Sequence, residues 1–288
     1  MERELFTIIK DALDSIPQAS ARPHKCQYTD RDIVMTLVWA TLHDRPVDWA
    51  CKRCNWPSHD RTRPLPSGAT VSRRARSEAI IALRAQVLME LRVQAPDRTL
   101  LLDAKALPVS GHSSDRDAKA GYYSSGIARG FKLHMIADSA GNPLAFDVAP
   151  LNVHETTMAR VLLDRVPPKP GATLLADGAY DCNDLYDAAW TKGVQMIAAP
   201  RRKHAQTIGH RRHSPRRLIA IHIRTVDPSV LAPRRRIESH FGTMGNVVGG
   251  LSPLPNHVRG LRRVKQWVTL KLVIDAAHRR RRHQRATA

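Results

Sequence analysis

Three acidic residues stand at positions where carboxylates could hold divalent metal ions. Asp103 and Asp177 each end a short apolar run, and Glu238 follows inside an arginine-rich segment of helical character. Mg²⁺ and Mn²⁺ prefer such oxygen ligands. A pair of these ions can lower the pKa of an attacking water and neutralise a leaving alkoxide. The residue types and their context therefore indicate metal-dependent attack on a phosphodiester.

The distribution of positive charge indicates a polyanionic partner. The 288 residues carry a formal net charge of +20, and residues 201–288 contain 21 Lys and Arg against three acidic residues, so this third alone carries +18. A folded surface of this charge is typical of proteins that bind nucleic-acid phosphates. The alternative is a disordered basic tail near residues 279–285, but most of the excess precedes it, in segments that look folded.

Cysteine content and hydropathy narrow the class of protein. Four cysteines in a chain of this length do not form a disulfide framework. Cys51 and Cys54 form one C-x-x-C pair where a structural zinc site usually needs two, so packing along a short helix is favoured over zinc. No run reaches the length of a membrane span, and the first residues lack a secretion-signal pattern. We expect a cytoplasmic protein without a membrane partner.

Residues 1–95 are expected to form a small all-helical N-terminal domain. Thr29 is a plausible cap with Asp32 in its capping box, and Thr70 is expected to cap a segment that carries Arg73 and Arg74. Apolar residues recur at helical spacing in residues 5–16, 33–38 and 80–91. These helices fit either a DNA-binding helix-turn-helix or a helical cap on the main domain, and the pattern leaves both open.

From about residue 96 the periodicity changes to short apolar runs, which predicts an α/β domain over residues 96–278. Gly141-Asn142 predicts a hairpin between its second and third strands. Residues 200–232 are rich in proline and basic residues and are expected to be an irregular insertion, and 279–288 a basic tail. The strands are expected at 99–102, 131–137, 144–148, 173–176 and 194–198, and the helices at 154–163, 181–191, around 238 and at 261–277.

Three antiparallel strands followed by alternating helices and strands is the element order of a ribonuclease-H-like domain, a mixed sheet flanked by helices. A right-handed crossover places a parallel strand beside the first strand. The carboxyl ends of such neighbours meet at one edge of the sheet. We therefore expect Asp103 and Asp177 to meet there, although 74 residues separate them.

Five segments resemble the DDE transposases of bacterial insertion sequences, specifically family four and the allied family five. They are LLDAKAL, GFKLHMIADSAGNPLAF, LNVHETTMA, LLADGAYD and RRRIESHFG, and the resemblance spans about residues 97–278. It implies that Asp103, Asp177 and Glu238 are the catalytic and metal-binding residues, with two Mg²⁺ or Mn²⁺ ions. It also implies double-stranded DNA, both element ends and target, as partner, a homodimer on that DNA, and a bacterial, nucleoid-associated protein.

The glutamate signature of that family is Tyr-x2-Arg-x3-Glu-x6-Lys. Arg234 and Glu238 match it, whereas Leu231 stands in place of the tyrosine and Gly245 in place of the lysine. In the family these two positions help to hold the transposon end. Arg235 and Arg236 are candidates to replace them as phosphate contacts.

Several residues near the expected site have two interpretations. Lys132 and His134 either contact phosphate or form a solvated strand face. Asp181 is expected to cap a helix rather than to bind metal. Glu155 is either an acidic neighbour of the site or a favourable charge at a helix start. Trp267 is expected in the core.

Basic residues around the expected site and in the N-terminal domain are the candidates for DNA contact. They are Lys132, Arg201, Arg202, Lys203, Arg211, Arg212, Arg234, Arg235, Arg236, Arg262, Arg263, Lys265, Arg73 and Arg74. The resemblance implies cleavage and strand transfer, in which the freed 3′-hydroxyl attacks target DNA. The alternatives are a ribonuclease-H-like nuclease that cuts without joining and a DNA-binding relic without turnover.

Overall fold

The computed structural model describes residues 1–17, 27–58, 64–123, 126–200, 213–246, 251 and 253–287. The chain divides into two compact units. A helical unit comprises Met1–Val93, Met244–Leu251 and Pro255–Ala288, and an α/β unit comprises Gln94–Thr243 and Ser252–Leu254. The boundary after Val93 lies close to residue 95, where the apolar periodicity changes.

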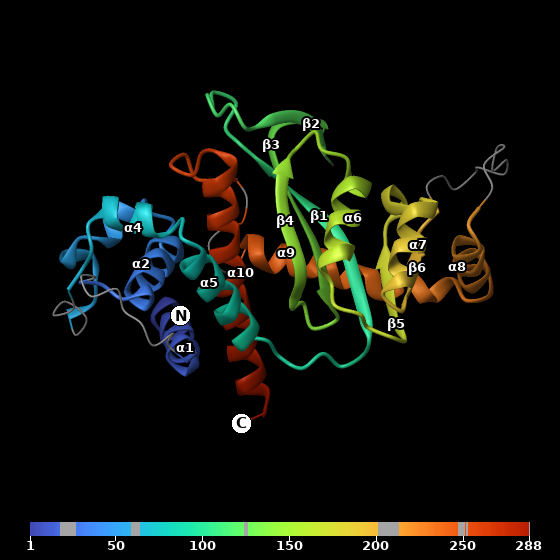
Figure 1. Ribbon diagram of the computed structural model, residues 1–288, viewed down its shortest axis with the longest axis horizontal. Helices are drawn as coiled ribbons and strands as arrows, with labels where there is room; N and C mark the ends of the chain where they lie inside the picture. The colour runs from blue at the N-terminus through green and yellow to red at the C-terminus, as the bar shows by residue number, and fades with distance from the viewer. Residues whose placement is uncertain are drawn as a thin grey trace. The chain divides into compact units, whose positions relative to one another are not determined.

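The elements of the helical unit are α1 (Glu2–Ser15), α2 (Asp30–Leu42), α3 (Val47–Ala50), η1 (Arg53–Asn55), α4 (Gly68–Arg74), α5 (Glu78–Glu90) and α10 (Leu261–Thr287) (Figure 1). Of these, α2, α4 and α5 begin with side-chain caps. Thr29 caps α2 and forms the expected capping box with Asp32. α4 is capped by Ser67, whose hydroxyl accepts the N–H of Thr70. The expectation that Thr70 is the cap is therefore wrong, because Thr70 already lies in the first turn.

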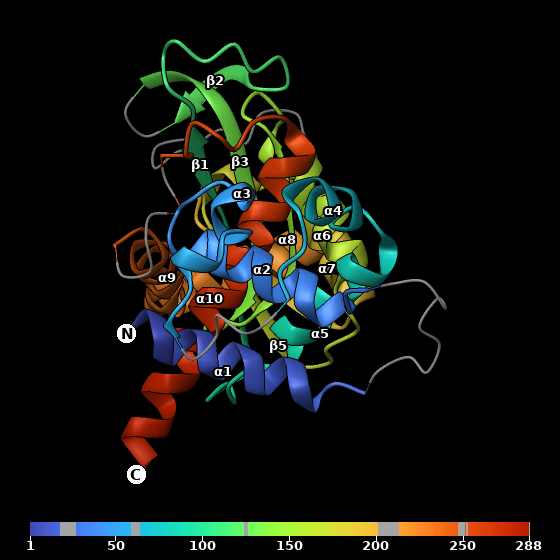
Figure 2. The ribbon, with the colours of Figure 1, turned by 90° about the vertical axis from the view of Figure 1, so that its left-hand side faces the viewer.

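The long C-terminal helix α10 belongs to the helical unit. It packs on α1, α2 and α5, and Figure 2 shows it among these helices. Trp267 is buried there, as expected for a core residue. Near the end of the helix, Arg281 and Arg285 pair with Glu4 at 2.8 Å and 3.0 Å. The units therefore divide the chain differently from the sequence-based expectation, which put this helix in the α/β domain and a tail after it.

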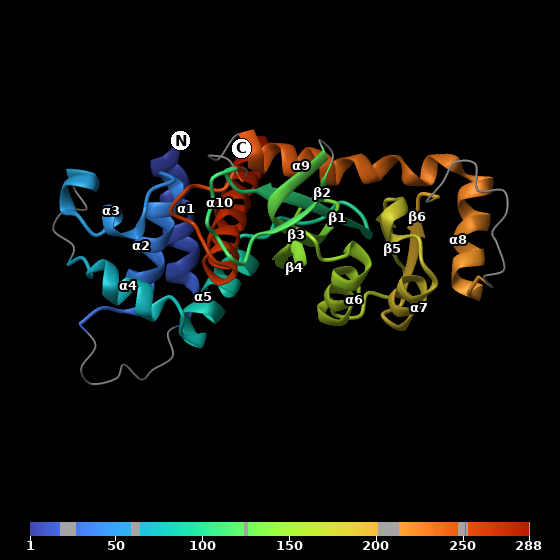
Figure 3. The ribbon, with the colours of Figure 1, turned by 90° about the horizontal axis from the view of Figure 1, so that it is seen from above.

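The α/β unit is a mixed sheet with helices on both faces. Its elements are β1 (Thr99–Pro108), β2 (Lys119–Tyr123), β3 (Gly126–Asp138), β4 (Pro143–Pro150), α6 (Glu155–Arg165), β5 (Ala172–Ala176), η3 (Gly178–Tyr180), α7 (Asn183–Thr191), β6 (Val194–Ala198), α8 (Pro215–Val226) and η4 (Pro228–Arg234), and α9 (Arg235–Asn246) begins in it. α6 and α7 cover one face, and η4 and α9 run along the other (Figure 3).

The strand order is β2-β3-β1-β5-β6, with β4 also paired to β3. β3 runs antiparallel to its neighbours β1 and β4, whereas β1, β5 and β6 run parallel. β5 and β6 are buried along most of their length, because parallel strands with both faces covered must be apolar throughout. The expected mixed sheet flanked by helices is confirmed.

The turn at Gly141 was predicted correctly, whereas the helix that begins at Pro215 was not predicted. Gly141 has φ +85° in the turn between β3 and β4, where a glycine is favoured, so the predicted hairpin is correct. β2 was not expected. α8 lies within residues 200–232, which were expected to be irregular; Pro215 is its first residue, where proline is tolerated, and Ser214 caps it.

No helix in the described ranges is both long and apolar enough to cross a membrane.

Candidate active site

Asp103 and Asp177 lie side by side where the parallel pairing of β1 and β5 ends, Asp103 within β1 and Asp177 directly after β5. β1 and β5 pair with Leu102 opposite Ala176, and each aspartate is the next residue in its own chain segment. Residues at the same level of adjacent strands are about 4.8 Å apart, and Asp177 keeps an extended backbone. Their side chains therefore point to the same face of the sheet. The expected neighbouring position of the two segments is present, but the expectation that Asp103 ends its strand is wrong, because β1 continues to Pro108 by pairing with β3.

Burial controls the charge of Asp103. Burial raises the pKa of this carboxyl to about 7. The backbone N–H of Ala104, which donates to Oδ1 at 2.8 Å, lowers the pKa, but by less than burial raises it. The negative charges of Asp177 and Glu155 raise this pKa further, and the guanidinium of Arg234 lowers it. A carboxyl with a pKa in this range changes charge near neutral pH, where a bound cation would keep it ionised.

Asp177 ends its strand as the cap of η3. Its Oδ1 accepts the N–H of Ala179 at 2.9 Å. Burial raises the pKa of Asp177, and the negative charges of Glu155 and Glu238 raise it further. Both aspartates therefore belong to one group of mutually repelling carboxylates.

Glu238 approaches this group from α9 and is held by an ion pair. Nη2 of Arg234, one helical turn earlier, lies 2.8 Å from Oε1 of Glu238, whose side chain is 55% exposed. The charges of both Arg234 and Glu238 act on Asp177. The two signature residues that matched the family pattern thus form a pair beside the aspartates. Leu231, which replaces the signature tyrosine, lies in η4, and Gly245 lies in α9.

The oxygen donors fit a divalent cation, although no ready-made cluster is present. Within the described part of the chain, no three His, Cys, Asp or Glu side chains are arranged to hold a metal ion. Mg²⁺ needs only one or two carboxylates and keeps several waters, which Asp103 and Asp177 can supply. Their raised pKa values also favour a bound cation. For Glu238 to join them, it must exchange its partner Arg234 for that cation.

Glu155 adds a fourth carboxylate and binds Lys132. Glu155 is the first residue of α6, where negative charge is favourable. Nζ of Lys132 lies 2.7 Å from Oε1 of Glu155. Lys132 is 8% exposed and His134 is fully buried, so the expectation of an outward strand face is wrong, because α6 packs over β3. Burial and the charge of Lys132 lower the pKa of His134 to about 4, which leaves the imidazole neutral at pH 7.

Tyr180 is a site residue that the sequence analysis missed. It is fully buried, and its hydroxyl has no hydrogen-bond partner among the described residues. Burial raises the pKa of Tyr180 well above its usual value, and the charges of Glu155, Asp103 and Asp177 raise it further. It therefore offers a permanent O–H donor next to the carboxylates. Its position three residues after Asp177 is the only local signal that points to it.

A family model described as the transposase DDE domain matches residues 94–274, which is more than half of the chain. The match contains all three carboxylates of the predicted site. The chain belongs to the DDE transposase family. Members of this family generally use divalent metal ions, and membership implies DNA cleavage in transposition.

The DDE transposase fold is also found in a solved structure. The cryo-EM structure of the piggyBac transposase synaptic complex with hairpin DNA matches with a TM-score of 0.51 and 9% sequence identity. The similarity covers 99% of this chain and 73% of that chain. At this identity it concerns the fold alone. The comparison with curated proteins gives no match.

The basic residues of the DDE transposase chain that were expected to contact DNA differ in their surroundings. Arg235 is exposed on α9, whereas Arg236 pairs with Asp97 at 3.0 Å. In the helical unit Arg73 is exposed, but Arg74 forms an ion pair with Asp30. Arg74 thus ties α4 to α2, which contradicts its expected role as a free DNA contact.

Other expected DNA contacts lie at the start of α10 or outside the described ranges. Arg262 and Arg263 are exposed and Lys265 is half-buried. Those outside the described residues are Arg201, Arg202, Lys203, Arg211 and Arg212. Of the basic cluster in residues 201–217, the structure thus describes only the part on α8.

Asp181 anchors α8 and does not cap α7. Nε and Nη2 of Arg217 lie 3.0 Å and 2.9 Å from its two carboxylate oxygens, and the hydroxyl of Tyr186 donates to Oδ1 at 3.0 Å. The residue at the N-cap of α7 is Cys182. The cap expectation is wrong because an arginine 36 residues away binds the carboxylate in bidentate fashion.

Replacing Arg217 by methionine is expected to destabilise the α/β unit by about 3–5 kcal/mol, because the buried carboxylate of Asp181 would lose its only described cationic partner. Arg216→Met is the matched control, since Arg216 lies on the exposed ring of Trp190, 3.6 Å from its centroid. The control should lose about 1 kcal/mol or less. Urea unfolding at pH 7 measures both, and equal losses would show that the ion pair does not anchor α8.

Proposed function

We propose that this chain is a DNA transposase that cuts the ends of a bacterial insertion sequence and joins them to target DNA. The observation that carries the proposal is the register of β1 and β5, which places Asp103 and Asp177 directly after the paired residues Leu102 and Ala176, inside the matched DDE domain. Double-stranded DNA is its substrate, and a homodimer on DNA would bring two element ends together. The formal net charge of +20 supports a polyanionic substrate.

The side chains have separate tasks in this proposal. Asp103 and Asp177 bind Mg²⁺ or Mn²⁺, with Glu238 as the third carboxylate. Two such ions, when bound, lower the pKa of the attacking hydroxyl and neutralise the leaving oxygen. Arg234, once released from Glu238, is free to bind a phosphate oxygen. Lys132 holds the carboxylate of Glu155 in place beside the aspartates.

Both chemical steps are in-line displacements at phosphorus, so one site can carry out both in turn. Water attacks first and frees a 3′-hydroxyl, which then attacks a second phosphodiester in the target. A similar architecture without the second step would be a ribonuclease-H-like nuclease. Two observations favour a second candidate, a DNA-binding relic without turnover. The signature tyrosine and lysine are replaced by Leu231 and Gly245, and within the described residues the carboxylates do not form a ready metal cluster.

A plasmid assay separates these functions. Supercoiled plasmid carrying the DNA that flanks this coding region is incubated with the full chain and a labelled target duplex, with Mg²⁺, Mn²⁺ or EDTA. We expect metal-dependent nicks at short inverted repeats and labelled products joined to the target. Nicks without joined products would indicate a nuclease. Binding that responds to salt but produces no metal-dependent nicks would overturn the catalytic assignment.

A further inference from the structure

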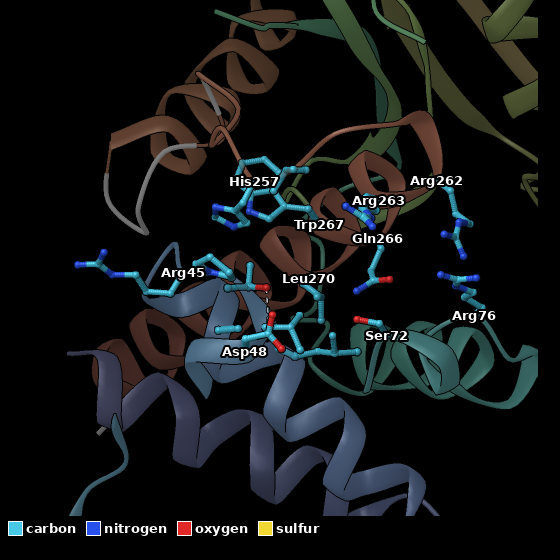
Figure 4. Close-up of a pocket in the computed structure, with 16 residues that line it drawn as sticks. Arg45, Asp48, Ser72, Arg76, His257, Arg262, Arg263, Gln266, Trp267 and Leu270 are labelled. Atoms are coloured by element: carbon cyan, nitrogen blue, oxygen red, sulfur yellow. Dashed lines mark hydrogen bonds between the residues drawn. The ribbon is translucent and has the colours of Figure 1, made fainter. Parts of the chain in front are cut away.

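Tyr180 keeps a buried hydrogen-bond donor without a protein acceptor. Its side chain is 0% exposed, and its hydroxyl has no partner among the described residues. Trp267, in the wall of a cavity of the helical unit, also has an unpartnered N–H, but its Nε1 atom is itself buried, and the labelled side chains around the opening are mostly basic (Figure 4). Buried polar groups nearly always have a partner, because an unpaired donor destabilises the fold. The surroundings of Tyr180 show what that partner is.

The turn after β5 brings the hydroxyl of Tyr180 to the carboxylates. Asp177 caps η3, and its carbonyl oxygen accepts the N–H of Tyr180 at 3.2 Å. α6, which begins at Glu155, packs against η3. The negative charges of Glu155, Asp103 and Asp177 all raise the pKa of Tyr180, and Glu155 does so most strongly. The side chains whose charges act on this hydroxyl are therefore all hydrogen-bond acceptors.

Each of these carboxylates uses one oxygen within the fold. Oδ1 of Asp103 and Oδ1 of Asp177 each accept a backbone N–H, and Oε1 of Glu155 is held by Lys132. The second oxygen of each is left for a cation or a further donor. None of these described carboxylates lies within hydrogen-bond distance of the Tyr180 hydroxyl. A polar gap of this kind is commonly bridged by a buried water molecule.

We propose that Tyr180 is a positioning residue for a cation at Asp103 and Asp177. Its hydroxyl donates to one bridging water molecule, and that water donates its two hydrogens to Glu155 and Asp103. Three hydrogen bonds are the usual number for a buried water. A carboxylate oxygen has two lone pairs, so it can accept from the water and still bind a cation. The inference rests on the proposed function, because it takes the cation at this pair as given.

The test compares Tyr180→Phe with Tyr186→Phe in the full chain. Both variants remove one hydroxyl from a buried tyrosine of the α/β unit, at 0% and 1% exposure. The hydroxyl of Tyr186 donates to Asp181, which anchors α8. The probe is Mn²⁺ alone, without DNA, followed by the electron paramagnetic resonance signal of the free ion. Binding that Asp103→Asn abolishes is assigned to the aspartate pair.

We expect Tyr180→Phe to raise the Kd for Mn²⁺ about tenfold or more, the usual effect of losing a hydrogen bond behind a metal ligand. Its melting temperature in EDTA should stay close to that of wild type, because no hydrogen bond within the protein is lost. Tyr186→Phe should keep the wild-type Kd and melt several degrees lower, because it loses a bond to a charged group. Wild-type Mn²⁺ affinity in Tyr180→Phe would overturn the proposal. So would an affinity loss accompanied by the same loss of melting temperature as in the control, which indicates a structural role.

Plasmid nicking separates this role from the proposed function. We expect the Mg²⁺ concentration for half-maximal nicking to rise about tenfold or more in Tyr180→Phe, and saturating Mg²⁺ to restore the wild-type rate. A rate that saturating Mg²⁺ does not restore would overturn the positioning role. Wild-type protein that nicks, beside a Tyr180→Phe variant with unchanged Mn²⁺ affinity, refutes the role of Tyr180 alone. Weakened Mn²⁺ binding in the variant without nicking by wild type refutes the catalytic function alone. Wild-type protein without Mn²⁺ binding at Asp103 would overturn both.

Discussion

Asp103→Asn and Asp177→Asn are each expected to reduce Mg²⁺-dependent DNA nicking by about a thousandfold or more. That loss corresponds to about 4 kcal/mol of transition-state stabilisation, which is the scale of charge neutralisation by a metal ion. Asparagine keeps the size of the side chain but removes the charge that the two strand ends bring together. DNA affinity should stay within about twofold, because neither aspartate belongs to the basic surface.

Asp164→Asn is the matched control for these variants. Asp164 lies near the end of α6 in the same unit, with an exposed side chain that pairs with Arg160 one turn away. Such a surface pair contributes about 1 kcal/mol or less, so nicking should be unchanged. Filter binding and plasmid nicking separate affinity from catalysis. If either Asp103→Asn or Asp177→Asn nicks at the wild-type rate, the paired aspartates are not the catalytic residues.

Asp103→Asn is also expected to stabilise the metal-free protein at alkaline pH. The pKa of Asp103 is about 7 in the folded chain because of its burial, against an ordinary value of 3.8. Between these values the folded state binds a proton that the unfolded state has lost. Stability therefore falls as pH rises from about 4 to 7, and the whole difference is present above pH 7. Its upper limit is about 4 kcal/mol, from three pKa units at 1.36 kcal/mol each.

The measurement is thermal or urea unfolding of wild type and Asp103→Asn in EDTA at pH 4.5 and pH 8. The advantage of the variant should be small at pH 4.5, close to the pKa of the unfolded chain, and much larger at pH 8. Adding Mg²⁺ at about a hundred times its Kd should stabilise wild type at pH 8 by about 2.7 kcal/mol and leave the variant unaffected. A variant that is less stable than wild type at pH 8 without metal would contradict the proposed charge cluster.

Much of the catalytic sheet can be predicted from local sequence. Leu100–Leu102 and Leu174–Ala176 are continuous apolar runs because their strands are buried on both faces. The Gly141-Asn142 pair predicts the turn between the second and third strands, and Gly141 has the positive φ that such a turn favours. Right-handed crossover then makes the two strands neighbours. The meeting of Asp103 and Asp177 thus follows from short-range patterns together with one topological rule.

Helix boundaries near prolines and buried polar residues could not be predicted in the same way. Pro215 suggests a break in the chain, yet it opens α8, because proline is tolerated wherever the first N–H needs no partner. Asp181 has the sequence context of a cap, but Arg217 binds it from a distant segment. Lys132 and His134 alternate along a strand, and only the packing of α6 decides that both are buried.

The sequence by itself therefore determined the strands other than β2 and the capping box at Thr29, because these depend on interactions among near neighbours in the chain. With the right-handed crossover rule it also predicted that Asp103 and Asp177 lie on neighbouring strands. The tertiary structure alone decided that Glu238 binds Arg234 outside an assembled cluster, that Tyr180 lies among the carboxylates, and that α10 completes the helical unit. The physical reason is that burial and ion pairing depend on which distant segment lies opposite. Local spacing does not carry that information.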